Sequence, residues 1–341
     1  MSARQTQSFL MRRLAEAGLR PDTRHGQHFL IDLNLLDLLV RTADVGPHDV
    51  VLEIGTGVGS LTGRLAERAA AVVTVEIDPR LAALAAEELS GRNNVTMLVQ
   101  DALKNKHTVH PQVLAALRQQ LAAHPGSIWK LVANLPYNAA TPILSNLLEV
   151  DPPPASLTAT IQKELAERIT AKPGTKDYSA LSVWIQAQCA VQIVRLIPPQ
   201  AFWPRPKVHS AILQIVPNAA RRRALEDPAF FHDLVRTLFC HRRKYLRGVL
   251  ASALADRLDK AELESLLTPL HLPPDVRAEQ LDVPTLIALA QEVRQALTKR
   301  AKGGQAVSLA VARAEAADPA QGGGAAAGNT SYPSRSERNV P

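Results

Sequence analysis

The chain has 341 residues, which is long enough to bury a large core and to form two domains. Its hydrophobic content of 46% is ordinary for a soluble globular protein, no apolar run approaches the roughly 18 residues that cross a bilayer, and the polar, basic N-terminus lacks the apolar segment of a signal peptide. The formal net charge of +7 and the pI near 9.6 favour an anionic partner, and we expect a cytoplasmic protein with no contact to a membrane.

The first part of the chain is predicted to form an N-terminal extension. Residues 7–18 have the spacing of a short amphipathic helix that ends at Gly18. The segment His25-Gly26-Gln27-His28-Phe29-Leu30 then leads into a second helical pattern from Ile31 to Val40. Taken alone, this segment is interpreted as a packing helix.

A buried strand followed by glycines comes next. Residues 50–54 have the pattern of a buried strand, and residues 55–59 (Gly-Thr-Gly-Val-Gly) precede a helix that reaches Arg68. Glycines at this place let a ligand approach the backbone, and the helix N-terminus favours negative charge. A dinucleotide fold would have its third glycine at the position of Ser60. The observed spacing, with Glu53 two residues before the first glycine, instead resembles motif I of S-adenosylmethionine-dependent methyltransferases.

Acidic side chains follow the next two predicted strands. Residues 72–75 end at Glu76, and after a helix over 80–89 the strand 95–99 is followed by Asp101. A carboxylate at the place of Glu76 can accept hydrogen bonds from ribose hydroxyls, and one at Asp101 can accept from an adenine amino group. Each acid alone is more often a solvated loop charge, but Glu53, Glu76 and Asp101 at the ends of three successive strands indicate a nucleoside site.

The fourth strand, over residues 128–133, leads into Asn134-Leu135-Pro136-Tyr137. The Asn134 side-chain oxygen and a backbone carbonyl can accept both protons of an exocyclic amine, and Tyr137 can stack on its ring. The structural alternative is a proline turn closed by a half-buried tyrosine.

No metal site is expected. His107, His110 and His124, which flank a predicted helix over 112–123, lack metal-ligand spacing. Cys189 and Cys240 form no Cys-x-x-Cys motif, so we predict two buried thiols in a reducing compartment.

Three further strands complete a set of seven. They are predicted over 157–161, 191–196 and 211–216, with helices over 139–148, from residue 162 onward and after a loop at 173–178. Between the last two strands, prolines fix Phe202, Trp203, Arg205 and Lys207 on a stiff segment. This segment could stack a base and contact phosphate, or it could simply be a proline-stiffened hairpin connection.

The C-terminal part is predicted to be helical over 228–239, 245–257, 260–269 and 283–299. It contains a basic cluster with few acids nearby, which is the electrostatic pattern expected for contact with a phosphate backbone. The cluster comprises Arg221, Arg222, Arg223, Arg236, Arg242, Arg243, Lys244 and Arg247. From residue 301 the composition is rich in Gly, Ala and Ser, which predicts a disordered tail.

Together these motifs resemble the KsgA/RsmA-type ribosomal RNA adenine dimethyltransferases. The resemblance implies an α/β fold, a Rossmann-like class I S-adenosylmethionine methyltransferase with a mostly parallel seven-stranded sheet, plus a small all-helical C-terminal domain. We expect an N-terminal extension over 1–25, a methyltransferase domain over 26–218, an RNA-contacting helical domain over 219–300 and the tail over 301–341. The motifs that carry the resemblance are Gly26 to Leu30, Glu53 to Thr62, Glu76-x-Asp78, Asp101-Ala102, Asn134 to Tyr137, Pro173 to Val183, Pro198 to Ser210, His241 to Arg247 and Arg277 to Glu279.

The resemblance also implies the residues of the site. Tyr137 and Phe202 would enclose the target adenine. The catalytic set would be Asn134, Leu135, Pro136, Tyr137 and Phe202; S-adenosylmethionine would contact His28, Leu30, Gly55, Glu76, Asp101 and Asn134; RNA would contact Arg205, Lys207, Arg221, Arg222, Arg223, Arg242, Arg243, Lys244 and Arg247.

Three departures from the family pattern are present. His28 stands where the family usually has asparagine, and Ser179 stands where glycine is usual. The stretch 102–127 is longer than expected for the family and is predicted to be a surface elaboration.

The function implied is transfer of a methyl group from the S-adenosylmethionine sulfonium to adenine N6, twice on each of two adjacent adenines. The substrate would be the hairpin loop near the 3′ end of 16S rRNA in the immature small ribosomal subunit, methylated during ribosome biogenesis by a monomer. Two alternatives remain: an Erm-type methyltransferase of 23S rRNA, and a non-catalytic RNA-binding assembly or transcription factor with the same fold.

Overall fold

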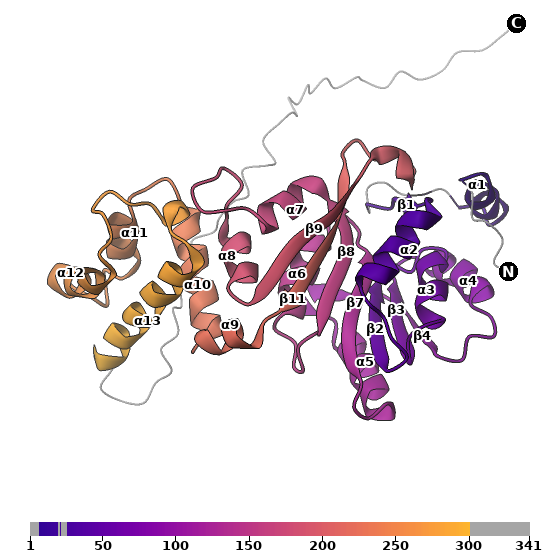
Figure 1. Cartoon of the computed structure of the whole chain (residues 1–341), viewed down its shortest axis with the longest axis horizontal. Helices are drawn as coiled ribbons and strands as arrows, with labels where there is room; N and C mark the ends of the chain where they lie inside the picture. Colours follow the sequence, from indigo (N-terminus) through magenta and orange to yellow (C-terminus); the bar gives the residue numbers. More distant parts are fainter. Residues whose placement is uncertain (1–6, 20, 22–25, 301–341) are drawn as a thin grey trace, which may run out of the picture. The chain divides into compact units, whose positions relative to one another are not determined.

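The computed structural model of the chain describes residues 7–19, 21 and 26–300 (Figure 1). The predicted tail over 301–341 therefore lies outside the described residues. The predicted extension over 1–25 is described only at residues 7–19 and 21.

A seven-stranded sheet forms the centre of the fold, in the order β4-β3-β2-β7-β8-β11-β9. Its neighbours are parallel except for β11, which runs antiparallel to both β8 and β9. The predicted mostly parallel sheet is thus confirmed. The strands are β2 (Asp49–Ile54), β3 (Ala71–Glu76), β4 (Val95–Val99), β7 (Ile128–Asn134), β8 (Ser156–Gln162), β9 (Cys189–Ile197) and β11 (Ser210–Pro217).

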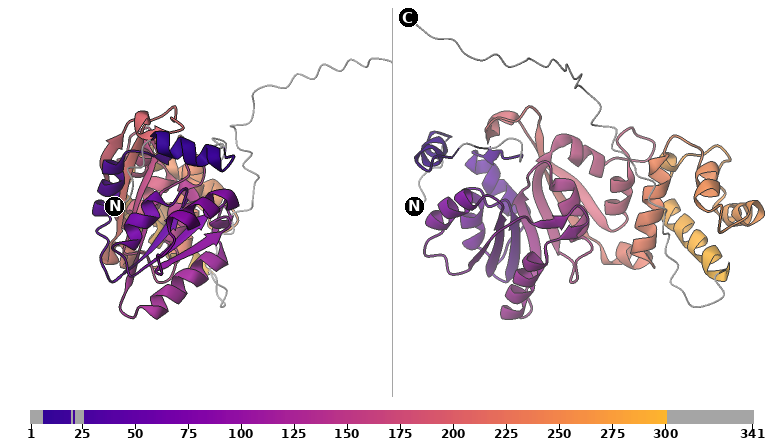
Figure 2. Two further views of the ribbon diagram at one scale, coloured as in Figure 1. Left: turned by 90° about the vertical axis from the view of Figure 1, so that its right-hand side faces the viewer. Right: turned by 180° about the vertical axis from the view of Figure 1, so that it is seen from behind.

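Both faces of the sheet are covered by helices, as Figures 1 and 2 show. Successive side chains of a strand point to opposite faces. Val50 and Leu52 of β2 belong to a core cluster with α5 to α8, whereas Val51 belongs to a second cluster with α2 and α3. The helices are α2 (Leu33–Thr42), α3 (Ser60–Ala66), α4 (Pro79–Glu88), α5 (Pro111–Ala123), α6 (Ala140–Leu147), α7 (Lys163–Ile169) and α8 (Ala180–Gln186).

The stretch 102–127 is not a simple surface elaboration, so that prediction was wrong. A small hairpin of β5 (Leu103–Asn105) and β6 (Thr108–Val109) precedes α5. Val113 and Leu117 of α5 are fully buried in the core of the sheet. Because these two apolar residues are four positions apart, they lie on one face of the helix, and α5 covers the sheet there.

The N-terminal helix α1 (Gln7–Glu16) packs on helix α4. Leu10 and Leu14 form a small apolar cluster with Leu81 and Leu84. The predicted helix at this place is confirmed, and its apolar face is covered by the methyltransferase-like part of the chain.

The C-terminal helices share their core with the sheet, since one continuous apolar cluster includes both. Trp184 of α8 stacks on His232 of α10, with ring centroids 4.4 Å apart. Asp227 and Asp259 cap α10 and α12 by accepting hydrogen bonds from backbone N–H groups. The helices are α9 (Ala219–Ala224), α10 (Pro228–Cys240), α11 (Leu246–Ala253), α12 (Lys260–Leu267) and α13 (Val283–Arg300), with short 3₁₀ turns at Thr268–Leu270 and Ala278–Gln280.

One of the two cysteines is not where we predicted it. Cys189 is buried at the start of β9, but Cys240 is exposed at the end of α10. The expectation of two buried thiols was therefore wrong for Cys240, because the terminal residue of the helix turns away from the face that packs on the core.

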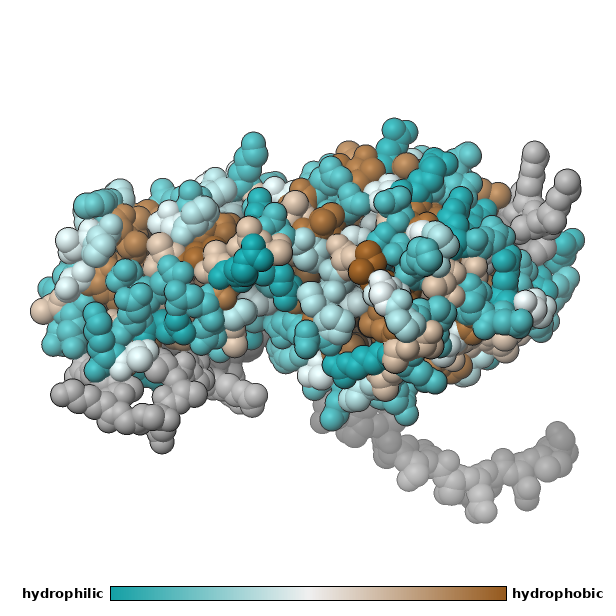
Figure 3. All heavy atoms as spheres, turned by 60° about the horizontal axis from the view of Figure 1, so that its bottom comes forward, coloured by the Kyte–Doolittle hydropathy of each residue, from teal (hydrophilic) through white to brown (hydrophobic). Residues whose placement is uncertain are grey.

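Among the described residues, no helix is both long and apolar enough to span a membrane. On the face drawn in Figure 3, apolar side chains appear in small groups among hydrophilic ones. That distribution is ordinary for a folded domain in water.

Candidate active site

A cavity of about 370 Å³ opens at the carboxyl ends of β2, β3, β4 and β7. In an open α/β sheet this is where the order of strands reverses, here between β2 and β7, and where ligands bind. Its lining includes four of the predicted cofactor residues besides Asn134: His28, Gly55, Glu76 and Asp101.

Two glycines after β2 are favoured by their backbone conformation, and one of them also by a close neighbour. Gly55 has φ +88°, and a Cβ there would lie 3.5 Å from the Asn134 carbonyl oxygen. Gly57 has φ +57°, and a Cβ there would lie 3.2 Å from the ring of Phe29. Positive φ favours glycine at both positions, and at Gly57 the Phe29 ring also leaves a Cβ less room than ordinary van der Waals contact.

Glu76 fastens this loop and faces the cavity. Its carboxylate accepts hydrogen bonds from the backbone N–H of Gly57 at 2.8 Å and of Asp78 at 3.0 Å. Burial raises the pKa of Glu76 above its ordinary value, while the two backbone donors oppose that shift. A carboxylate held in this way has remaining lone pairs that can accept from a pair of ribose hydroxyls.

Glu53 lies behind the loop and does not line the cavity, so the predicted set of three acids at the site is reduced to two. It is fully buried, and its Oε2 accepts from the hydroxyls of Thr62 and Thr74, both at 2.6 Å. Burial raises the pKa of Glu53 from 4.5 to about 8. The residue therefore links β2, β3 and α3 as a largely protonated internal acid.

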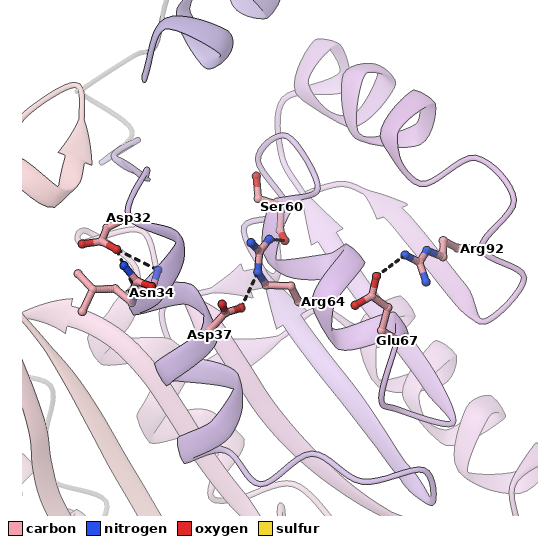
Figure 4. A network of polar contacts seen from close by, with 8 residues as sticks. Asp32, Asn34, Asp37, Ser60, Arg64, Glu67 and Arg92 are labelled. Atoms are coloured by element: carbon pink, nitrogen blue, oxygen red, sulfur yellow. Dashed lines mark hydrogen bonds and ion pairs between the residues drawn. The ribbon is translucent and has the colours of Figure 1, made fainter. Parts of the chain in front are cut away.

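A polar network fixes the start of α3, where the glycine loop enters the helix (Figure 4). The guanidinium of Arg64 donates to Asp37 Oδ1 and to the Ser60 carbonyl, both at 2.9 Å. Asp32 in turn caps α2 by accepting from the Asn34 and Leu35 N–H groups. Because Arg64 joins α3 to α2, the N-terminus of α3 is held in place beside the site.

Asp101 follows β4 and is exposed at the edge of the cavity. One carboxylate oxygen accepts from the Leu103 N–H at 2.9 Å. This bond orients the side chain, and the second oxygen can accept from an amino group of a bound nucleoside.

The amide of Asn134 is oriented by a hydrogen bond to a residue far away in the sequence. Its Nδ2 donates to the His28 carbonyl at 2.8 Å. The orientation assigns Oδ1 as the acceptor left for an incoming amine. His28 itself is held to the stiff segment that follows β9, since its Nδ1 lies 2.7 Å from the Pro204 carbonyl oxygen and must donate to it.

Tyr137 closes the same loop. Its hydroxyl hydrogen-bonds Ser210 Oγ at 2.6 Å, and its ring centroid lies 5.2 Å from that of His28. Burial raises the pKa of the Tyr137 hydroxyl, so it is neutral at physiological pH. The Pro136 carbonyl already accepts from the Ala139 N–H, which favours the Leu135 carbonyl as the second acceptor for an amine.

A second, more open cavity of about 510 Å³ adjoins the first. Gly26, His28 and Asn138 line both. Tyr137, Arg205 and Lys207 line the second cavity alone. A ligand in the first cavity and a base in the second would therefore meet beside His28 and the Asn134–Tyr137 loop.

Two predicted site residues lie elsewhere. Phe202 is only 2% exposed and packs in the core cluster with Leu30 and Leu36, so in this structure it offers no open face to a base. The predicted enclosure of adenine by Tyr137 and Phe202 is not formed, because Phe202 is paired with Leu30 between β1 (Phe29–Leu30) and β10 (Phe202–Trp203). Leu30 lines only a smaller cavity of about 50 Å³ beside Gly55 and Asn134.

Trp203 was not among the predicted site residues. It is half-buried and stacks on Phe29, with ring centroids 6.5 Å apart. This pair joins the segment before α2 to the stiff segment around Pro204. The sequence placed Trp203 in this stiff segment but did not predict its contact with Phe29.

Arginines of the predicted RNA-binding cluster donate hydrogen bonds to backbone carbonyls of the protein itself. Arg221 donates to the carbonyls of Gln186 and Cys189, and Arg222 donates to that of Leu148. These two side chains are therefore engaged at least in part by the protein's own carbonyls, and their contact with RNA stays a prediction.

The remaining cations of the cluster divide into paired and exposed ones. Arg242 lies 3.5 Å from Glu279, and Arg247 pairs with Glu264. Arg223, Arg236, Arg243 and Lys244 are exposed and can contact a phosphate backbone.

The first cavity fits S-adenosylmethionine by its own chemistry. Its walls include Ile54, Val75, Ile77 and Ala102, which suit a flat heterocycle. Carboxylates at Glu76 and Asp101 suit hydroxyl and amino donors. The volume lies within the range of small-molecule sites, roughly 300–1,000 Å³.

Comparisons with known proteins agree with this site. The family model described as "Ribosomal RNA adenine dimethylase" matches residues 19–279. A protein of Bacillus cytotoxicus called ribosomal RNA small subunit methyltransferase A is 40% identical over 260 residues, covering 76% of this chain and 86% of that protein. One of Halothermothrix orenii with the same name is 36% identical over 267 residues, covering 78% and 85%.

Two solved structures are also similar. A dimethyladenosine transferase from Plasmodium falciparum superposes with a TM-score of 0.65 at 26% identity, covering 79% of this chain and 98% of that one. The 23S rRNA methyltransferase ErmE gives a TM-score of 0.55 at 26% identity, covering 77% and 98%.

Proposed function

The chain belongs to the ribosomal RNA adenine dimethylase family, and we propose that it dimethylates N6 of two adjacent adenines in the 3′-terminal hairpin loop of 16S rRNA. S-adenosylmethionine is the methyl donor. The proposal includes action on immature small subunits, by a monomer, in the cytoplasm.

The observation that supports it most is the orientation of Asn134 where the two cavities meet. Its Nδ2 is engaged by the His28 carbonyl, so its Oδ1 is committed to accepting a hydrogen bond. An exocyclic amine presented from the second cavity can donate one proton to this oxygen and the other to the Leu135 carbonyl. Asn134 ends β7 and pairs with Thr160 of β8, and the N–H of the next residue, Leu135, donates to the Thr160 carbonyl at 3.1 Å.

When bound, S-adenosylmethionine supplies an electrophilic methyl group on its sulfonium. The amine of adenine is a weak nucleophile because its lone pair is delocalised into the ring. In the first transfer, two acceptors placed on the amine protons localise that lone pair and aim it; in the second transfer, the one remaining N–H uses one of the two acceptors, which is again catalysis by position and electrostatics. Tyr137, anchored through Ser210, offers an aromatic face in the second cavity to hold the base.

The amine proton is held at Asn134 Oδ1 or at the Leu135 carbonyl until the N–C bond has formed. It then leaves to solvent, because neither acceptor is basic enough to keep it. Tyr137 is not the base, since its raised pKa keeps the hydroxyl protonated. His28 orders the loop through its carbonyl and its bond to Pro204.

Primer extension on both rRNAs from strains with and without the gene tests the substrate. We expect a block at two adjacent adenines near the 3′ end of 16S rRNA only when the gene is present. A gene-dependent block in 23S rRNA would favour the Erm-type alternative. Methyl transfer to isolated immature small subunits adds the second test, because a non-catalytic binding factor would give none.

A further inference from the structure

Tyr245 is an exposed aromatic side chain in the C-terminal part. It immediately precedes α11 and is 54% exposed. Of the large apolar or aromatic side chains that the described part of the chain exposes strongly, it is the only aromatic one. Its side chain makes no capping hydrogen bond to α11. Neither core packing nor helix capping therefore accounts for an aromatic ring at this position.

The backbone beneath Tyr245 is held firmly. Tyr245 and Arg277 pair as an isolated antiparallel β-bridge, and the Leu246 N–H donates to the Val276 carbonyl at 2.8 Å. Arg242 donates to the carbonyls of Lys176 and Tyr178 and so fastens the preceding turn. The ring consequently projects from a fixed support, which lowers the entropy lost when a partner stacks on it.

The immediate surroundings are cationic. The guanidinium of Arg277 lies 5.8 Å from the centroid of the Tyr245 ring. Arg243 and Lys244 precede Tyr245 in the chain, and both are exposed, as is Arg277. An exposed aromatic ring with one cation beside it and two more next to it in the chain suits a nucleotide, whose base stacks while its phosphates contact the cations. An apolar protein partner would be disfavoured by three adjacent charges.

We infer that Tyr245 is a stacking platform for one unpaired base of the RNA substrate, with Arg243, Lys244 and Arg277 contacting the flanking phosphates. This inference rests on the proposed function for the identity of the RNA. It assigns a second contact point outside the two cavities. It also separates the predicted basic cluster into members that bind the protein's own backbone and members that bind RNA.

Binding of the full-length chain to immature small subunits tests the inference, measured by filter binding over a range of KCl concentrations. Tyr245→Ala should weaken binding about tenfold while leaving the salt slope unchanged, because stacking releases no counterions. Tyr245→Phe should bind within about twofold of the wild type, and Tyr245→Leu should be as weak as the alanine variant, since stacking needs the ring and not its bulk. Replacing Arg243 and Lys244 by alanine should flatten the salt slope.

Ile128→Ala is the matched control. Ile128 is 51% exposed at the start of β7, the end of the strand away from both cavities, so the variant removes a similar exposed apolar surface without affecting affinity. The inference is overturned if Tyr245→Ala binds as tightly as the wild type, or if Tyr245→Leu does. It is also overturned if Tyr245→Phe is as weak as the alanine variant. Binding lost together with helical circular dichroism would assign Tyr245 to folding and overturn it as well.

The readout also separates this inference from the proposed function. Wild-type chain that binds small subunits but transfers no methyl group would refute the function and leave the Tyr245 result standing. Wild-type chain that methylates adenine, with all Tyr245 variants binding equally, would refute only the platform.

Discussion

Replacing Asn134 by alanine tests how the catalytic loop works. The change removes the acceptor Oδ1 from the meeting point of the two cavities, and it removes the 2.8 Å hydrogen bond to the His28 carbonyl. The second loss costs about 1 kcal/mol of folding free energy, the usual net value of one hydrogen bond. The first removes one of two groups that stabilise the transition state, for which a loss of about 10²–10³ in kcat is expected.

Single-turnover methyl transfer to immature small subunits measures the chemical step, and calorimetry measures S-adenosylmethionine binding. We expect Asn134→Ala to melt a few degrees lower, to bind the cofactor within about threefold of the wild type, and to lose roughly 99% of turnover or more. Asn94→Ala is the control, because Asn94 also donates its amide to backbone carbonyls, those of Ala66 and Ala69, but lies outside both cavities. It should lose stability and keep its turnover rate. An Asn134→Ala enzyme with near-normal single-turnover rates would refute the assigned role.

Three other changes probe the glycine turn, the buried acid and the RNA-facing cations. Gly26→Ala should lower kcat by about tenfold or more, because Gly26 has φ +69° and a Cβ there would lie 3.0 Å from the backbone nitrogen of Tyr137. Gly174→Ala is the control and should keep its activity, since Gly174 has φ +78° but nothing within 4 Å of a Cβ. Equal rates for the two variants in the same assay would argue against the steric reasoning. Burial raises the pKa of Glu53 from 4.5 to about 8, so between these pH values the folded state keeps a proton that the unfolded state releases. The free energy of unfolding of the wild type should therefore fall between pH 4.5 and 8, by up to about 5 kcal/mol from this group. Urea unfolding at pH 5 and pH 8 should show a smaller change for Glu53→Gln, and equal changes in the two proteins would contradict the burial argument. Replacing Arg205 and Lys207 together by alanine should reduce the slope of log K for RNA binding against log salt concentration by about 0.7–0.9 for each phosphate that these two cations neutralise. Cofactor affinity, measured by calorimetry, should not change, and an unaltered slope would mean that the RNA binds elsewhere.

Much of the sheet could be predicted from local patterns. Runs such as residues 50–54 and 129–133 are buried on both sides, so a strand could be predicted there without reference to the rest of the chain. The location of the glycine loop and of Asn134 could also be predicted from the sequence, because residues at the end of a parallel strand lie at the carboxyl edge of the sheet. The helical C-terminal part followed from periodicity, although α9 was missed because its six residues are too few to show a period.

The remaining features depend on contacts between distant segments. The Asn134 amide is oriented by the His28 carbonyl, 106 positions earlier in the chain, and no local pattern encodes that hydrogen bond. Phe202 was expected to contact the base, but its side chain is buried. Sequence reasoning missed this because β1, the strand that pairs with Phe202, has only two residues and shows no recognisable pattern. Charge alone likewise did not show that Arg221 and Arg222 bind backbone carbonyls, since a cluster of arginines has the same composition in either role.

We propose that the loop at residues 134–137 directs an adenine amine to the methyl donor. This role of the loop can be measured by mass spectrometry of nucleosides from immature small subunits that were incubated with the purified full-length chain and S-adenosylmethionine. The proposed function predicts N6,N6-dimethyladenosine in the digest, with an initial rate of formation about 10²–10³ lower for Asn134→Ala. A methyl group found on another base, or on no base at all, would contradict it.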